Sequence, residues 1–290
     1  MDKVSKTPIL SVAIPTYNGE LTIKRTLECI LSQEEKDIEI VIGDDCSQDS
    51  TLQIAKSIKD QRLKIYPFRE RLGITGNWTR CIRRCSGKYV VLFGQDDEVK
   101  TNWAGEMIKA LEENNDADMA FCRRDFVYDD EESKKIVGYF FSDKYLKMLD
   151  GFYSNIKSKI YPDQMVKEAN RYSFEINLIG EPAFVIFRRD NPSFVEGFDP
   201  GMTQMMDWEF YTRFFINKPI IHIPKKLGVF HISVKGSSVE HARTLKKHYR
   251  EYLHLIPLVI KRFKAFLSKE DIELFISRMN EAFSYCFYES

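Results

Sequence analysis

Hydrophobic and polar positions alternate along residues 9–122 in a way that predicts strands and helices in turn. Short apolar runs rich in β-branched residues indicate buried strands, and apolar residues three or four positions apart indicate amphipathic helices. The predicted strands are residues 9–14, 38–42, 63–66, 89–93 and 118–122. The predicted helices are residues 21–33, 51–59, 75–85 and 102–114. This alternation predicts βαβ units and an α/β fold with a mainly parallel, Rossmann-like sheet flanked by helices.

The pattern changes after residue 122. Between residues 123 and 180, aromatic residues mix with lysines and acids and the strand–helix alternation is lost, so we expect an insertion or subdomain over a ligand site. The alternation then returns, with predicted strands at 183–187, 220–223 and 227–232 and a predicted helix at 207–217. From Thr244 onward the pattern is helical, and we expect a break at Pro257 because proline lacks an N–H donor.

These patterns predict one α/β domain in two halves, followed by a helical C-terminal extension. We place the first half at residues 1–122, the second at 123–240 and the extension at 241–290. Apolar residues make up 43% of the chain, which is enough for a sizeable core and argues against disorder. Lys plus Arg and Asp plus Glu both number 43, and this balance argues against a nucleic-acid partner.

The six cysteines are scattered and form no CxxC pair, so we interpret them as reduced, buried thiols. The first twelve residues lack the apolar core of a signal peptide, and no apolar run is long enough to span a membrane. We therefore expect a cytoplasmic protein. Peripheral contact with the inner face of the plasma membrane remains an alternative.

Polar clusters directly follow three of the predicted strands. They are Pro15-Thr16-Tyr17-Asn18, Asp44-Asp45 and Gln95-Asp96-Asp97. In open α/β sheets, ligands bind beyond the carboxyl ends of the strands, so we expect these clusters to meet. Adjacent carboxylates repel each other, and Mg²⁺ or Mn²⁺ relieves that repulsion when one or two carboxylates hold it together with phosphate oxygens. Each cluster alone is also compatible with a solvated turn that caps the next helix.

Three segments together resemble family 2 of the glycosyltransferases, which have the GT-A fold. They are SVAIPTYNGE at 11–20, EIVIGDDCSQDST at 39–51 and GKYVVLFGQDDEV at 87–99. A looser resemblance to the acceptor side of the family covers FVEGFDP at 194–200 and MMDWEFYTRF at 205–214. The resemblance implies an inverting enzyme that uses sugar nucleotides in the synthesis of bacterial polysaccharides of the O-antigen type.

On the donor side, the resemblance implies roles for five residues. Pro15 and Tyr17 match positions that hold the nucleotide base, Tyr17 by stacking, and Asp45 matches the aspartate that hydrogen-bonds the base. Asp96 matches a residue near the ribose. Arg71 lies where family members often carry a basic residue near the donor.

The resemblance also implies a metal site and a catalytic base. Asp97 matches the metal ligand, and His231 matches a histidine near the leaving diphosphate that can complete the coordination of Mn²⁺ or Mg²⁺. Asp207 matches the base. Two positions depart from the family, because Gly94 and Met206 stand where an aspartate and a glutamate are common. The second departure puts the contacts to the acceptor in doubt.

The expected function is transfer of a hexosyl or N-acetylhexosaminyl group from a nucleotide-diphosphate donor, with uridine as the favoured nucleotide. The acceptor would be a hydroxyl of a glycan or of a polyprenol-linked saccharide. One alternative is a non-catalytic or donor-hydrolysing sugar-nucleotide-binding protein of the same fold. A nucleotidyltransferase is disfavoured because the turn at 16–20 lacks the glycines and lysine of a P-loop.

The segment from Arg243 to Lys264 is strongly basic. It contains seven lysines and arginines and a single acid, Glu251, with apolar residues between them. One interpretation is a helix packed on the catalytic domain with its lysines in solvent. The other is an amphipathic helix on an anionic membrane surface, which would suit a lipid-linked acceptor.

Overall fold

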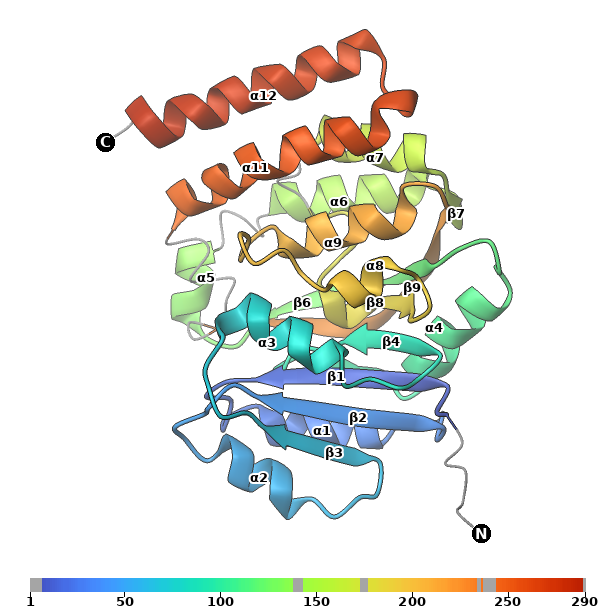
Figure 1. Ribbon diagram of the computed structural model, residues 1–290, viewed down its shortest axis with the longest axis vertical. Helices are drawn as coiled ribbons and strands as arrows, with labels where there is room; N and C mark the ends of the chain where they lie inside the picture. Colours follow the sequence, from blue (N-terminus) through green and yellow to red (C-terminus); the bar gives the residue numbers. More distant parts are fainter. Residues whose placement is uncertain (1–6, 138–142, 173–176, 234–235, 237–243, 289–290) are drawn as a thin grey trace.

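The structure is a computed structural model and describes residues 7–137, 143–172, 177–233, 236 and 244–288. At its centre is a mixed sheet with helices on both faces (Figure 1). The strands are β1 (Leu10–Thr16), β2 (Ile38–Asp44), β3 (Leu63–Pro67), β4 (Tyr89–Leu92), β5 (Glu98–Val99), β6 (Met119–Tyr128), β7 (Lys159–Ile160), β8 (Val185–Arg188) and β9 (Ile220–Ile232). Their order across the sheet is β3-β2-β1-β4-β8-β6-β9-β5, with β7 paired to β9.

Helices separate most of the strands along the chain. The α-helices are α1 (Ile23–Leu31), α2 (Thr51–Ser57), α3 (Gly73–Ile82), α4 (Trp103–Glu112), α5 (Glu131–Val137), α6 (Asp143–Asn155), α7 (Pro162–Arg171), α8 (Ser193–Glu196), α9 (Met206–Phe215), α11 (Leu245–Phe263) and α12 (Lys269–Tyr288). Two short 3-10 helices are η1 (Pro182–Phe184) and η2 (Lys264–Phe266).

The first four strands of the chain form the parallel part of the sheet. β1 lies between β2 and β4 and runs parallel to both, and β2 runs parallel to β3. Beyond β4 the directions are mixed, because β8 is antiparallel to β4 and β6, whereas β9 is parallel to β6. The expected parallel arrangement therefore describes the N-terminal half, where the three polar clusters lie.

Alternate residues of each strand pack into two separate cores, one on each face of the sheet. Val12 of β1 belongs to the core that also contains Trp103 of α4. Its neighbour Ala13 faces the other core, which contains Cys81 of α3 and Phe210 of α9. In Figure 1, α3 and α9 lie in front of the sheet and α1 lies behind it. All six cysteines are free thiols, and four are buried as expected, whereas Cys29 and Cys46 are partly exposed.

The described part of residues 123–180, where we expect an insertion or subdomain, is mostly regular structure. β6 continues beyond residue 122 to Tyr128, and α5, α6 and α7 follow it; residues 138–142 and 173–176 lie outside the described part. The two short strands predicted at 220–223 and 227–232 are one strand, β9. Its register against β6 shifts beside Arg123, and the irregularity accommodates the exposed Lys225 and Lys226 between two buried stretches.

The break expected at Pro257 is also wrong. α11 runs through Pro257 and ends only at Phe263. The proline side chain is exposed, whereas Leu255, Ile256 and Val259 on either side are fully buried. Packing of these neighbours therefore holds the helix together although the ring removes one backbone hydrogen bond.

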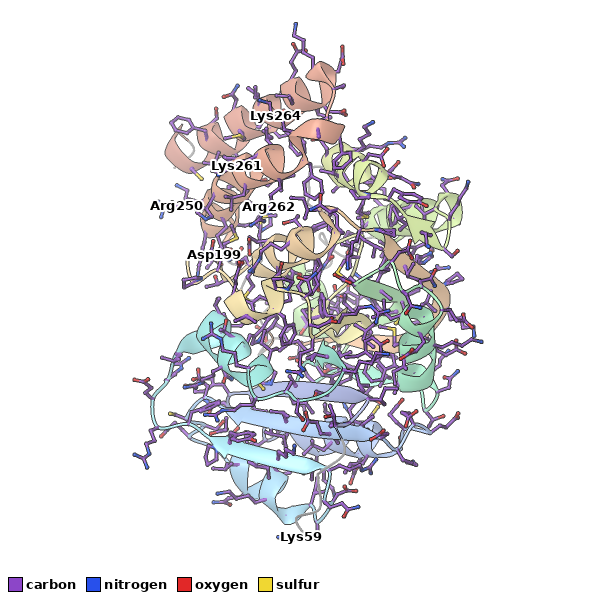
Figure 2. All side chains as sticks on the ribbon, turned by 45° about the vertical axis from the view of Figure 1, so that its right-hand side comes forward. Lys59, Asp199, Arg250, Lys261, Arg262 and Lys264 are labelled. Carbon is purple, nitrogen blue, oxygen red and sulfur yellow. The ribbon has the colours of Figure 1, made fainter. Side chains whose placement is uncertain are left out.

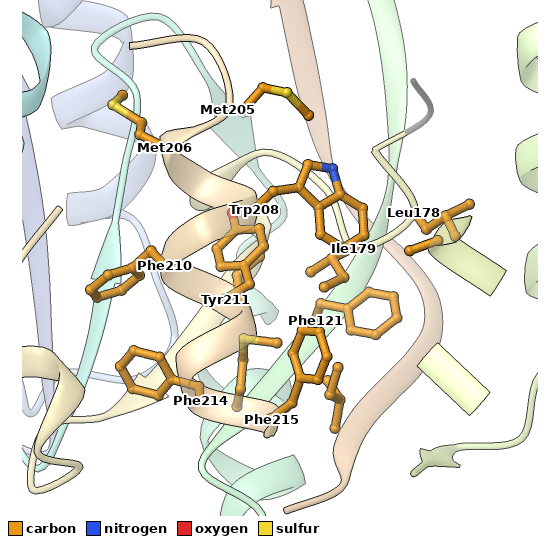
Figure 3. Packing of buried hydrophobic residues seen from close by; sticks show 14 of the residues in the cluster. Phe121, Leu178, Ile179, Met205, Met206, Trp208, Phe210, Tyr211, Phe214 and Phe215 are labelled. Carbon is orange, nitrogen blue, oxygen red and sulfur yellow. The ribbon is translucent and has the colours of Figure 1, made fainter. Parts of the chain in front are cut away.

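The C-terminal helices belong to the core of the protein. α11 packs along α12, both contact α7, and the ring of Phe263 lies 5.3 Å from that of Phe215 on α9. Figure 3 shows α9 in the middle of this core, with Trp208, Tyr211 and Phe214 among its buried side chains. In the part of the chain that the structure describes, no helix is both long and apolar enough to cross a membrane.

Candidate active site

The loops after β1 and β2 are tied together at the carboxyl edge of the sheet. The backbone N–H of Asn18 donates to Ser47 Oγ at 3.0 Å, and that of Gln48 donates to Asn18 Oδ1 at 2.8 Å. Asn18 and Cys46 both have positive φ, 49° and 64°, a conformation that side chains other than glycine rarely adopt. Such local strain is common at functional sites. Pro15 is buried in β1, and Tyr17 follows, partly exposed.

Two of the predicted donor-binding residues are in direct contact. The guanidinium of the exposed Arg71 lies over the ring of Tyr17, 3.9 Å from its centroid. A cation over an aromatic face is attracted by the electron density of the ring. The loop before α3 therefore covers the aromatic side chain that the sequence assigns to the nucleotide base.

Asp45 anchors that loop. Its carboxylate accepts hydrogen bonds from the backbone N–H groups of Leu72 and Gly73, both at 2.9 Å, and pairs with Arg80. These donors belong to the start of α3, so the carboxylate stabilises the N-terminus of that helix. Asp45 is 2% exposed. Its predicted contact with a base remains a prediction.

Gln95 belongs to one of the three predicted polar clusters, but nothing in the sequence assigned it a role of its own. Its side-chain amide accepts from the backbone N–H of Tyr17 and donates to the carbonyl of Tyr17, both at 3.1 Å. From the other side, Arg25 and Thr26 of α1 donate to the backbone carbonyls of Asp96 and Gln95, both at 2.9 Å. Gln95 thus fixes the predicted stacking residue against the acidic turn.

Asp96 and Asp97 are adjacent acids after β4, of which Asp96 is partly exposed and Asp97 is buried. Burial raises the pKa of Asp96 to about 6 and raises that of Asp97 well above its usual value, and the carboxylates of Asp96 and Glu181 raise the latter further. Asp97 Oδ1 is buried without a hydrogen-bond partner. Gly94 leaves space for this arrangement, because a Cβ there would lie 2.4 Å from Asp97 Oδ2. A buried carboxylate oxygen that lacks a partner fits a divalent cation.

His231 lies beside the acidic pair. Its Nδ1 is 2.6 Å from Asp129 Oδ1 and its Nε2 is 3.1 Å from Glu98 Oε1, and its charge acts on the pKa of Asp96. No group of three or more His, Cys, Asp or Glu side chains within the described ranges is arranged to hold a metal. Asp97 can therefore supply only part of a coordination sphere, and substrate phosphates would supply the rest.

Asp207 lies in the first turn of α9. Its Oδ1 accepts from the backbone N–H of Trp208 at 2.7 Å, and its Oδ2 accepts from Asn177 Nδ2 at 3.1 Å. Burial raises the pKa of Asp207 to about 7, and the charge of Glu181 contributes to the increase. A carboxyl group with a pKa near 7 suits general base catalysis at neutral pH.

Glu181 links the two halves of the site electrostatically, because its charge raises the pKa of both Asp97 and Asp207. It forms an ion pair with Arg124, whose side chain is fully buried, at 2.6 Å. Arg124 also donates to the hydroxyl of Tyr153 at 2.7 Å. Neither Glu181 nor Arg124 stood out in the sequence, because the surrounding segment has no regular pattern.

Trp208 is not a surface for sugar stacking. It is 3% exposed and packs into the core beside α9 (Figure 3). Met206 is also buried, and its sulfur accepts from the hydroxyl of Thr75 on α3 at 3.4 Å. The methionine that replaces the common glutamate therefore contributes to the packing of α9 on α3.

The model of Glycosyl transferase family 2 matches residues 11–190, and the chain belongs to this family. A similar curated protein is the GalNAc(5)-diNAcBac-PP-undecaprenol beta-1,3-glucosyltransferase of Campylobacter jejuni, 24% identical over 201 residues. That match covers 62% of this chain and 63% of the relative, so the chain spans about two thirds of the relative's length.

Solved structures confirm the GT-A fold. S. aureus TarS 1-349 in complex with UDP superposes with a TM-score of 0.64 at 17% identity, covering 96% of this chain and 72% of TarS. The mannosyltransferase PcManGT from Pyrobaculum calidifontis, in complex with GDP-Man and Mn2+, gives a TM-score of 0.63 at 16% identity. That superposition covers 99% of this chain and 89% of PcManGT. The fold class predicted from the sequence is therefore confirmed.

Proposed function

We propose that the protein transfers a hexosyl or N-acetylhexosaminyl group from a UDP-sugar to a hydroxyl of a glycan or polyprenol-linked acceptor, with inversion. The observation that carries the proposal is the match of the family 2 glycosyltransferase model to residues 11–190. The charge of Glu181 acts on the carboxyl groups of both Asp97 and Asp207, which supports assigning a cation ligand and a proton acceptor to the same site. The UDP bound by TarS and the undecaprenol-linked substrate named for the Campylobacter relative support the assignment of donor and acceptor.

In this proposal, the donor lies across the carboxyl ends of β1, β2 and β4. Pro15 and Tyr17 contact the base, Asp45 hydrogen-bonds it, and Asp96 lies near the ribose. The Arg71 guanidinium lies over the ring of Tyr17. When the donor binds, this group can move to the base or to the diphosphate.

Asp97 and His231 would hold Mn²⁺ or Mg²⁺. Asp129 would orient the His231 ring through Nδ1, as carboxylates commonly do for metal-bound histidines. When bound, such a cation stabilises the negative charge that develops on a leaving diphosphate.

Asp207 takes the proton from the acceptor hydroxyl as that oxygen attacks the anomeric carbon. A single displacement of this kind inverts the anomeric configuration and needs no covalent intermediate with the protein. Asn177 donates to Asp207 Oδ2 and so holds the carboxylate in one orientation. A base must lie within hydrogen-bond reach of the proton that it removes, so this orientation matters for the rate.

The proposed function predicts a donor-specific thermal shift. UDP-sugars with Mn²⁺ should raise the melting temperature, because a ligand that binds only the folded state stabilises it. GDP- and dTDP-sugars serve as controls for the base. Transfer to a polyprenol-diphosphate saccharide should then release UDP, and NMR of the product should show the inverted anomer. Binding without release of UDP in the presence of acceptor would instead favour a sugar-nucleotide-binding protein without transfer.

We further infer that the protein contacts the inner face of the plasma membrane through α11. In the described part of the basic segment, the exposed lysines and arginines are Lys246, Lys247, Arg250, Lys261 and Lys264. Four of these residues, Lys246, Arg250, Lys261 and Lys264, follow one another at intervals of four, eleven and three residues. These intervals place them on one face of a helix. Glu251, the only acid in the segment, is buried. Arg243 lies outside the described residues.

This contact would be electrostatic, because the apolar face of α11 is already buried in the protein. Figure 2 shows Arg250 and Lys261 of α11 and Lys264, which directly follows α11, at one end of the molecule and Lys59 at the other. Anionic headgroups attract such a row of cations, and each lysine or arginine strengthens the attraction. A lipid-linked acceptor would then be presented close to α9, against which α11 packs.

The membrane contact predicts salt-sensitive binding to anionic vesicles. The full chain should sediment with vesicles that contain phosphatidylglycerol at low salt, but not with pure phosphatidylcholine vesicles, and high salt should release it. Reversing the charges of Arg250, Lys261 and Lys264 to glutamate should weaken binding at least about tenfold. The matched control reverses Lys56, Lys59 and Lys109, which are also exposed. Equal losses in both variants would show that only net charge matters and would refute the assignment to α11.

A further inference from the structure

Glu251 of α11 accepts hydrogen bonds from the loop that leads into α9. Its carboxylate accepts from the backbone N–H groups of Thr203, Gln204 and Met205 at 2.7–3.0 Å, and from the hydroxyl of Thr203 at 2.9 Å. Glu251 is 5% exposed. A buried carboxylate in this position stabilises three consecutive N–H groups that would otherwise lack partners at the start of the helix.

The helix that begins in this loop carries Asp207. Met205 is the residue before α9, and its carbonyl accepts from the N–H of Glu209 at 3.1 Å as part of the first turn. Asp207 uses one oxygen to accept from the N–H of Trp208 in the same turn. The orientation of the Asp207 carboxylate is therefore set by the position of that turn, and Glu251 holds the residues that precede it.

A second contact ties α11 to α9 further from Asp207. Arg262 donates to Thr212 Oγ1 at 2.7 Å and pairs with Glu209 at 2.6 Å. Arg213 also pairs with Glu209 at 2.8 Å, so this acid keeps a partner when Arg262 is removed. The two contacts differ in what they hold, because Arg262 fixes the middle of α9, whereas Glu251 fixes its start.

We propose that Glu251 is a positioning residue for the acceptor reaction, acting through the 203–205 loop to set the orientation of Asp207. The proposal rests on the proposed function, in which Asp207 is the base. Glu251 does not touch the substrate in this view. Its carboxylate matters because three N–H donors need an acceptor with two oxygens and a full negative charge. The C-terminal helices are then part of the catalytic arrangement.

The test separates kcat from KM in two matched variants. In Glu251→Gln, the side-chain amide retains one acceptor oxygen and places an NH₂ group against backbone N–H donors, so the loop should shift. A displacement of about 1 Å at a catalytic group can cost about a hundredfold in rate. We expect kcat for transfer to fall to that extent while KM for the donor stays unchanged. Glu251→Asp, which keeps the charge, should recover part of the rate.

Arg262→Met is the control, because it removes the other contact between α11 and α9. It should lower the melting temperature as Glu251→Gln does but leave kcat close to that of the wild type. Hydrogen exchange of the amides at 203–205 should speed up in Glu251→Gln and not in Arg262→Met. Faster exchange with an unchanged kcat would refute the positioning role while leaving the proposed function intact. A wild-type protein that transfers no sugar would refute the proposed function, and unchanged exchange at 203–205 in Glu251→Gln would still refute the role of Glu251.

Discussion

Replacing Asp207 with asparagine is expected to lower the rate of sugar transfer by about a hundredfold to ten-thousandfold, because it removes the proposed general base. Donor binding should persist, since Asp207 lies on the acceptor side of the site. The measurement is single-turnover transfer at saturating donor, together with the thermal shift caused by UDP-sugar and Mn²⁺. Turnover near the wild-type level would refute the assignment of the base.

The pH dependence supplies a second readout of the same group. Only the ionised carboxylate accepts a proton, so transfer by the wild type should fall as the pH drops through about 7, the value to which burial raises the pKa of Asp207. The residual rate of Asp207→Asn should lack this step.

The raised pKa of Asp207 means that folding disfavours ionisation of this carboxyl group, so the wild type loses stability as the pH rises from the unfolded pKa of about 4 towards 7. Asp207→Asn should therefore melt higher than the wild type at neutral pH.

Asp199→Asn is a suitable control for this experiment. Asp199 lies in the loop before α9, is partly exposed, and pairs with His254 of α11 at 3.2 Å. Losing its charge changes the net charge as much as Asp207→Asn does. Transfer and its pH dependence should stay unchanged, because Asp199 has no role in proton transfer.

Replacing Asp97 with asparagine should abolish the metal-dependent part of donor binding and lower turnover by about a hundredfold to a thousandfold. Asp97 supplies the buried oxygen without a partner, and an amide is a poor ligand for Mg²⁺ or Mn²⁺ compared with a carboxylate. Thermal shifts with UDP-sugar, measured with Mn²⁺ and with EDTA, distinguish the metal-dependent part from the rest. If Mn²⁺ increased the thermal shift with UDP-sugar in the variant as much as in the wild type, Asp97 would not be a ligand of the cation.

Stability without metal provides a check on this second variant. Burial raises the pKa of Asp97, so its ionised form is costly in the folded protein at neutral pH, and asparagine should melt at the same temperature or higher. Asp44→Asn is the matched control. Asp44 is also buried at a strand end, but its oxygens accept from Thr16 and Ser47. That variant should lose stability and keep the effect of Mn²⁺ on donor binding.

Much of the donor half could be predicted from the sequence, because its information is local. Each strand is a short apolar run, and the polar residue that follows a parallel strand must lie at the carboxyl edge of the sheet. This pattern singles out Tyr17, Asp45 and Asp97, and their roles near the donor stay predictions. The register of β1 and β2 pairs Thr16 with Asp44 and so brings two of the clusters together.

The acceptor half was harder to predict because its contacts join residues far apart in the chain. Asn177 reaches Asp207 and Arg124 reaches Glu181, and neither pair has a spacing that a periodic pattern could reveal. Pro257 shows the same limit in another way, since long-range packing outweighed its local tendency to end a helix. A local signal did exist for Gln95, which directly precedes the acidic pair at a strand end. Its hydrogen bonds to Tyr17, however, join residues far apart in the chain, so the sequence pattern could not predict them.

The hydrogen bonds of Glu251 also bear on the order in which the protein can mature. A chain leaves the ribosome from its N-terminus, and the three strands followed by polar clusters, β1, β2 and β4, are made long before α11 emerges. The loop before Asp207 receives its acceptor for three N–H groups only when α11 has been made and has docked. Under the proposed function, a nascent or C-terminally shortened chain would therefore lack the contacts that orient the catalytic base.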